Sequence, residues 1–180
     1  MLVKHQVLFA LVVSVLAGVC TDGFQNGTLR YVIPESWKAV TGSSPMRLAE
    51  FVLPRIDGDD EDGVLVLYYF KGQGGSVQAN LSRWMSQMVQ SDDRSSRDAS
   101  TTQTLIANEL NLTVLEITGT YVAAVRPGAT ERYYKPDFKM VAAVVETPAG
   151  PYFIKLTGPR KTIERWSSEV QGFLRSMYFE

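Results

Sequence analysis

One stretch decides the fold of this 180-residue chain: FKMVAAVVETPAGPYFIKL, residues 138–156. Residues 138–147 form an apolar run rich in β-branched side chains, which predicts a strand. The Pro-Ala-Gly-Pro segment of residues 148–151 predicts a tight turn, after which residues 152–156 return as the hairpin partner. Side chains of the returning strand alternate between two faces, which puts Tyr152, Ile154 and Leu156 on one face and Phe153 and Lys155 on the other.

Two amphipathic segments predict helices that pack on this sheet. The first begins at Ser76, a residue type that caps helices, and its apolar residues recur at helical spacing: Val77, Leu81, Trp84, Met85 and Met88. We expect Thr157 or Gly158 to cap the second helix, with Pro159 in its first turn. The apolar stripe of this helix comprises Ile163, Trp166, Val170, Phe173, Leu174 and Met177.

Shorter apolar runs predict the other strands, at residues 29–33, 47–53, 64–70, 102–108 and 112–122. The run 64–70 is apolar on both faces, which is typical of a strand in the middle of a covered sheet. The last two strands should form a hairpin that turns near residues 109–111, whereas residues 91–101 and 127–136 are interpreted as loops. About six strands, largely in hairpins, and two main helices predict a largely antiparallel α+β domain.

The order of these elements resembles the PsbP/Mog1-like α/β/α sandwich: a strand, a Pro-x-x-Trp turn, two strands, a helix, several strands and a C-terminal helix opened by Gly-Pro. The sequence also resembles a family of uncharacterised exported bacterial proteins. This resemblance rests on residues 34–37, residues 43–47 (SSPMR), residues 69–84 (YFKGQGGSVQANLSRW) and residues 146–161 (ETPAGPYFIKLTGPRK). It implies an exported, non-catalytic accessory or binding domain.

Residues 1–20 have the pattern of an export signal. Lys4 supplies the positive start, and the apolar run from Val7 to Leu16 is too short for a transmembrane helix. The segment Leu-Ala-Gly-Val-Cys that ends at Cys20 resembles a lipobox with one extra residue before the cysteine. Either Cys20 is lipidated and anchors the protein to a membrane, or ordinary cleavage releases it into the periplasm. Residues 21–180 are then one α+β domain.

Charge and residue content exclude several classes of function. The formal net charge is -1, and removal of the signal takes away one further positive charge, so nucleic-acid binding is not expected. His5 and Cys20 are the only histidine and the only cysteine, and both lie within the first 20 residues. The exported domain would therefore lack an imidazole base. We predict no cofactor, no metal site and no enzymatic activity.

Residues 72–76, Gly-Gln-Gly-Gly-Ser, precede the first predicted helix. The backbone N–H groups of Gly74, Gly75 and Ser76 could hold an anion, because a helix N-terminus favours negative charge. The segment nevertheless matches neither G-x-x-x-x-G-K-[ST] nor G-x-G-x-x-G, the glycine motifs that bind nucleotides. A tight turn between strand and helix is therefore the preferred interpretation.

Residues 57–63, Asp-Gly-Asp-Asp-Glu-Asp-Gly, hold five carboxylates, the ligand type that Ca²⁺ prefers. Their spacing does not fit an EF-hand, because Asp62 stands at the sixth position in place of glycine and Tyr68 stands at the twelfth. We interpret the run as a solvated loop. The alternatives are weak calcium binding at this loop and a hydrolase that uses its carboxylates or a metal.

The predicted loop at residues 127–136 contains Tyr133 and Tyr134, with Arg132 beside them. Tyrosine and arginine are enriched at recognition surfaces, so this loop is a candidate surface for an envelope protein or a small ligand. The sequence thus predicts an exported, non-enzymatic accessory or binding domain of the bacterial cell envelope. It would contact a membrane only through a lipid at Cys20.

Overall fold

The computed structural model describes residues 27–41 and 46–180. The predicted hairpin is present at its centre, as strands β8 (Lys135–Glu146) and β9 (Tyr152–Pro159), which pair antiparallel with Val145 opposite Tyr152. The export pattern, His5 and Cys20 lie outside the described residues.

The hairpin grows into an eight-stranded sheet in which every strand pairing is antiparallel. On one side β9 pairs with β4 (Gly63–Tyr69), followed by β3 (Arg47–Leu53) and β2 (Lys38–Ala39). On the other side β8 pairs with β7 (Leu110–Tyr121). That strand in turn pairs with β6 (Ser100–Ala107) and with β5 (Met88–Val89).

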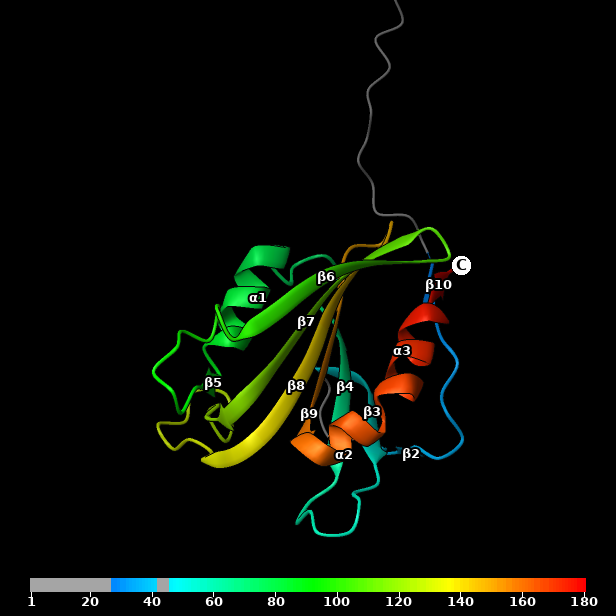
Figure 1. The fold of residues 1–180 in the computed structure, drawn as a ribbon. Helices are drawn as coiled ribbons and strands as arrows, with labels where there is room; N and C mark the ends of the chain where they lie inside the picture. Colours follow the sequence, from blue (N-terminus) through cyan, green and yellow to red (C-terminus); the bar gives the residue numbers. More distant parts are fainter. Residues whose placement is uncertain (1–26, 42–45) are drawn as a thin grey trace, which may run out of the picture.

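Helices cover both faces of the sheet, as Figure 1 shows. Helix α1 (Val77–Met85) packs on one face with a buried cluster that includes Leu115, Met140 and Phe153. Helices α2 (Arg160–Arg165) and α3 (Ser167–Arg175) pack on the other face over a larger cluster that includes Leu112, Ile154 and Phe173. The described residues therefore form an α+β fold with the sheet between helical layers. None of the described helices has the length and apolar content needed to cross a membrane.

The predicted count of about six strands is too low. Besides the eight-stranded sheet, β1 (Leu29–Arg30) pairs with β10 (Tyr178–Phe179) in a two-stranded sheet. Four strands have two residues each, and two residues are too few to show a sequence period. The strand predicted at residues 29–33 is shorter in the structure, because only Leu29 and Arg30 pair with β10, whereas Val32 and Ile33 are exposed.

The C-terminal helix also differs from the prediction, because it is two helices separated at Trp166. The Trp166 backbone leaves the helical region, and the indole Nε1 donates a hydrogen bond to the Pro54 carbonyl oxygen over 2.8 Å. Thr157 and Gly158 belong to β9, so neither caps the helix, and Pro159 occupies the N-cap position without a side-chain bond. The predicted apolar stripe is nevertheless buried throughout.

Two more boundaries move. Helix α1 ends at Met85, and Met88 lies in β5, where it stays buried against the same cluster as α1. The hairpin between β6 and β7 turns at Asn108 and Glu109, both with positive φ, and Leu110 is buried as the first residue of β7. Two consecutive residues with positive φ form the two-residue hairpin turn whose twist matches that of the paired strands. The turn is therefore one residue shorter than the predicted turn at residues 109–111.

Candidate functional site

A cleft of about 580 Å³ opens on the face of the sheet that α1 only partly covers. Its walls come from the start of β3, the strands β4 and β9, the end of β7, and the chain that leads from there into β8. The apolar part of its lining includes Val64, Val66, Tyr68, Val125 and Phe138. Seven charged side chains share the lining with this apolar surface, and a concave site that combines apolar walls with polar groups can hold a small molecule.

Lys155 stands in this cleft on β9, with Val66 of β4 on one side and Ala142 of β8 on the other. Its Nζ donates hydrogen bonds to Gln87 Oε1 at 2.5 Å and to Tyr121 Oη at 2.9 Å. It also lies 4.9 Å from the centroid of the Tyr121 ring. Charged residues are seldom placed on a central strand of a packed sheet, so this position points to a role beyond folding.

The electrostatic surroundings of Lys155 disfavour its charge. Burial lowers the pKa of the Lys155 ammonium to about 8, and the neighbouring cations Arg83 and Arg47 act in the same direction. Among the described residues no carboxylate lies within ion-pair distance of Lys155. The cation is thus held by two neutral oxygen acceptors instead of a counter-ion.

Tyr121 is fixed by its aromatic neighbours. Its ring stacks with Tyr133, with centroids 5.8 Å apart, and with Phe138, with centroids 6.1 Å apart. Burial raises the pKa of the Tyr121 phenol to about 12, so the hydroxyl stays protonated at neutral pH. Because this oxygen accepts from Lys155, its own hydrogen remains to be donated.

Apart from Arg126, the other charged groups in the cleft lining have partners among the described residues. Arg47 pairs with Glu50 at 2.6 Å, and Lys135 pairs with Glu61 at 2.5 Å. Asp62 accepts a hydrogen bond from the backbone N–H of Arg55. These contacts tie the acidic loop to the rim of the cleft.

The predicted recognition loop contributes unequally to the cleft. Tyr133 is part of the lining, whereas Tyr134 is 80% exposed and does not line it. Arg132 donates its Nε hydrogen to the Val122 carbonyl oxygen and so holds the loop together. The sequence therefore located one of the three residues in the cleft, and it missed Lys155, Tyr121 and Gln87. The signal for Lys155 was available, since it is the only charged residue in the predicted returning strand.

The glycine segment before α1 forms a turn, as preferred, and lies at a different hollow. Gly75 has φ +81° and an added Cβ at Gly74 would overlap the buried ring of Phe153, so both positions need glycine. Ser76 Oγ accepts from the Ala79 N–H and therefore caps the helix. The hollow beside Gly75 and Ser76 also contains Glu146, whose charge opposes an anion there.

The acidic loop, residues 57–63, contributes to the fold through a side chain that caps a helix. Asp59 Oδ2 accepts hydrogen bonds from the Thr162 N–H at 3.0 Å and from Thr162 Oγ1 at 2.6 Å, which caps the first turn of α2. In the part of the chain that the structure describes, no three His, Cys, Asp or Glu side chains gather in a way that could hold a metal ion. Calcium at this loop, and hydrolysis through it, gain no support from the geometry.

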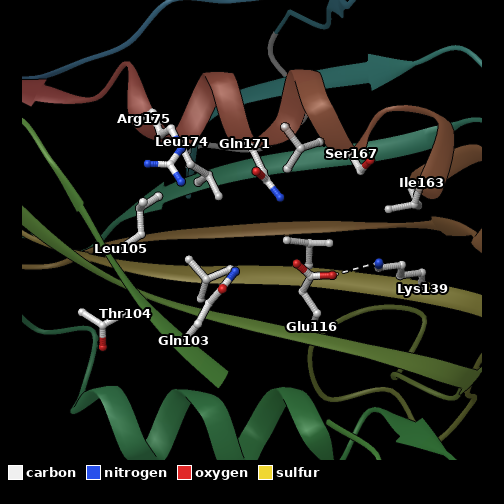
Figure 2. Close-up of a pocket in the computed structure, with 13 residues that line it drawn as sticks. Gln103, Thr104, Leu105, Glu116, Lys139, Ile163, Ser167, Gln171, Leu174 and Arg175 are labelled. Carbon is white, nitrogen blue, oxygen red and sulfur yellow. Dashed lines mark ion pairs between the residues drawn. The ribbon is translucent and has the colours of Figure 1, made fainter. Parts of the chain in front are cut away.

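A second hollow, of about 140 Å³, lies between α3 and the strands β6, β7 and β8. Figure 2 shows Glu116 and Lys139 rising from the sheet into it, joined by an ion pair of 2.8 Å. This lysine has its counter-ion beside it. The contrast with Lys155, on the opposite face, makes the larger cleft the better candidate site.

The comparisons with known proteins yield likenesses of structure. No protein-family model and no curated protein matches the sequence. The crystal structure of PA94 from Pseudomonas aeruginosa, a protein of unknown function named as a candidate regulator, is 13% identical. It covers 86% of this chain and 97% of its own, with a TM-score of 0.46. The solution structure of the cyanobacterial PsbP protein CyanoP from Synechocystis sp. PCC 6803 is 14% identical and covers 91% of this chain and 99% of its own, with a TM-score of 0.44.

Proposed function

We propose that this protein is an exported, non-enzymatic binding domain of the bacterial cell envelope, and that it holds a small ligand in the cleft between β4 and Tyr133. The observation that supports this most is the cleft of about 580 Å³, in which Lys155 lies beside apolar and aromatic side chains without a carboxylate partner. Polar groups held in place beside an apolar surface give a binding site its orientation and specificity.

The proposal extends to the fold family. We infer a PsbP/Mog1-like sandwich, related to the uncharacterised exported bacterial proteins that the sequence resembles. The order of the described elements and the helices on both sides of the sheet support it. A solved family member that superposes on the whole eight-stranded sheet would test it.

A binding role without catalysis is supported by how the carboxylates are used. Asp59 caps α2, Glu61 pairs with Lys135, and Asp62 holds the Arg55 backbone. A general base must be free to take up a proton, and these groups are engaged in contacts that fix the fold. Metal-dependent hydrolysis that is lost on Asp60→Ala would favour the hydrolase alternative.

Export and anchoring rest on residues 1–20. Intact-mass measurement of the protein from the membrane and the soluble envelope fractions tests them directly. A mass that corresponds to a diacylated or triacylated Cys20 supports a lipoprotein, and cleavage without added mass supports a soluble periplasmic protein. A mass that retains Met1 contradicts export.

The cleft is tested by binding. A library of neutral and charged fragments, screened by amide chemical shifts, should perturb residues of the cleft lining first. Tyr133→Ala should weaken binding of the fragments that bind best, whereas Tyr134→Ala, its exposed neighbour outside the lining, should not. A library without a single fragment that binds at the cleft contradicts the proposed function.

A further inference from the structure

Lys155 and Tyr121 present two hydrogen-bond donors at one point in the cleft. An ammonium group has three donors, and two of those on Lys155 are used by Gln87 and Tyr121. The third has no acceptor among the described residues. The hydroxyl hydrogen of Tyr121 likewise has no acceptor there, and the two donor atoms are 2.9 Å apart.

Donor pairs with this spacing suit an anionic oxygen. A carboxylate can accept one hydrogen bond on each of its oxygens or two on one oxygen, and bonds to charged groups are about twice as strong as neutral ones. The site also supplies the missing counter-charge for Lys155. An anion bound here would relieve the electrostatic penalty that the sheet position imposes on the ammonium.

The charge of the cleft limits the charge of the ligand. Four cations line it, Arg47, Arg126, Lys135 and Lys155, against three carboxylates, Glu50, Glu61 and Asp62. The lining therefore has an excess of one positive charge, which a monoanion balances. A phosphate dianion would leave the cleft with an excess of one negative charge beside its three carboxylates.

The floor of the cleft defines the rest of the ligand. Val64, Val66 and Tyr68 of β4 line it, and Phe138 of β8 adds an aromatic ring that stacks on Tyr121. This surface suits an apolar or aromatic body attached to the charged group.

We propose that the cleft binds a small organic monocarboxylate whose carboxylate accepts hydrogen bonds from Lys155 Nζ and Tyr121 Oη at the same time. This inference rests on the proposed function, since it names the ligand class of the same cleft. It identifies Lys155 as the anchor of the charge and β4 as the contact for the apolar body.

The test compares two probes of the same shape and different charge. Benzoate and benzamide are titrated into the processed protein at constant ionic strength, with binding followed by calorimetry and by the amide shifts of residues around Lys155. Benzoate should bind at least about tenfold more tightly than benzamide, because a charge-assisted hydrogen bond is lost with the neutral probe. Inorganic phosphate, as a third probe, should bind more weakly than benzoate.

Variants separate the anchor from the cleft. Lys155→Met keeps an unbranched side chain only one atom shorter and should weaken benzoate binding by about ten- to a hundredfold, and Tyr121→Phe by about tenfold. Lys139→Met, which removes the paired lysine of the other hollow, is the matched control and should leave benzoate binding unchanged. Circular dichroism confirms that each variant is folded.

The outcomes distinguish the two proposals. Equal binding of benzoate and benzamide in the cleft, or benzoate binding that survives Lys155→Met, overturns the carboxylate anchor and leaves the proposed function standing. Tighter binding of phosphate than of benzoate also overturns it. If no probe and no library fragment binds at the cleft, both proposals are wrong.

Discussion

Lys155 shows how one residue can link stability to function. Its neighbours Val66 and Ala142 are buried, and an apolar side chain in its place would complete the face of the sheet. The chain instead places a charge there, with no counter-ion among the described residues. A partly buried charge of this kind costs stability in its ionised form and is typical of a position retained for binding.

The pH dependence of stability follows from the lowered pKa of Lys155. Burial lowers this pKa from 10.5 in the unfolded chain to about 8 in the folded protein. Between these values the unfolded chain binds more protons, so the free energy of unfolding contributed by Lys155 rises as pH increases from 8 to 10.5. Urea denaturation across this window should show the rise in the wild type and its loss in Lys155→Met.

Other titratable or charged groups face Lys155, and their effects must be separated from its own. They are Arg83 on α1, Arg47 and Glu50 on β3, Tyr68 on β4, and Tyr121 on β7. Burial raises the pKa of Tyr121 from 10 to about 12, so its contribution falls as pH rises above 10. This fall is common to the wild type and Lys155→Met and cancels in their difference. A difference that does not change between pH 8 and pH 10 contradicts the lowered pKa of Lys155.

Gly74 allows a second prediction for a single residue. An added Cβ would overlap the ring of Phe153, which is buried between α1 and the sheet, so Gly74→Ala should lower the free energy of unfolding by about 1–3 kcal/mol. Gly172 in α3 is the matched control. It has open space around its Cα, and Gly172→Ala should raise the free energy of unfolding by about 0.5–1 kcal/mol. Thermal denaturation measures both, and equal effects of the two substitutions contradict the close approach at Gly74.

At the scale of elements, the acidic loop and α2 depend on each other. Asp59 Oδ2 accepts from both the backbone N–H and the hydroxyl of Thr162. Asp59→Ala removes this cap and should lower the free energy of unfolding by about 1–2 kcal/mol. Asp57→Ala, in the same loop but exposed, should change the free energy of unfolding by less than about 0.5 kcal/mol.

The same loop allows a test with calcium. Added Ca²⁺ should raise the melting temperature of neither the wild type nor the variants. A calcium-dependent increase contradicts the structural role of the loop.

The elements also show what sequence patterns can reveal. The β8–β9 hairpin was visible in the sequence, because an apolar β-branched run at residues 138–147 is followed by the Pro-Ala-Gly-Pro turn and by a short run, residues 152–156, whose side chains alternate between two faces. The division of the last helix at Trp166 was not visible, since it depends on a hydrogen bond from the indole to Pro54, more than a hundred residues earlier. The apolar stripe continues through the break and conceals it.

The same distinction applies to the candidate site. Tyr133 was found because tyrosine beside arginine is a local signal. The cleft itself joins β3, β4, β7 and β9 with a loop, and no local pattern reports which of their side chains meet. Gln87 illustrates this: it lies just after α1, and only the fold brings its Oε1 to Lys155.

For the whole molecule, the two ends of the described chain close one side of the larger core. Leu29 pairs with Phe179, the Thr28 N–H donates to the Glu180 carbonyl oxygen, and Arg30 pairs with Glu180 at 2.8 Å (Figure 1). Deletion of residues 178–180 removes β10 and exposes Leu29 and Met177. The free energy of unfolding should fall by about 2–5 kcal/mol, measured by urea denaturation. A loss below about 0.5 kcal/mol shows that the terminal pairing is not part of the stable fold.

The two helical layers share one sheet, and this determines how the protein unfolds. Trp84 reports on the cluster under α1, whereas Trp37 and Trp166 report on the cluster under α2 and α3. Each central strand contributes alternate side chains to both clusters, so neither can lose its packing while the other keeps an ordered sheet. We therefore expect a single cooperative transition.

Two variants test this in urea. A Trp37→Phe, Trp166→Phe double variant reports the fluorescence of Trp84 alone, and Trp84→Phe reports the fluorescence of the other two tryptophans. The two fluorescence midpoints should agree once each is corrected for the stability of its variant, measured by circular dichroism. Separate fluorescence and circular-dichroism midpoints within either variant would show that the two faces unfold independently, and that the described residues are not one cooperative domain.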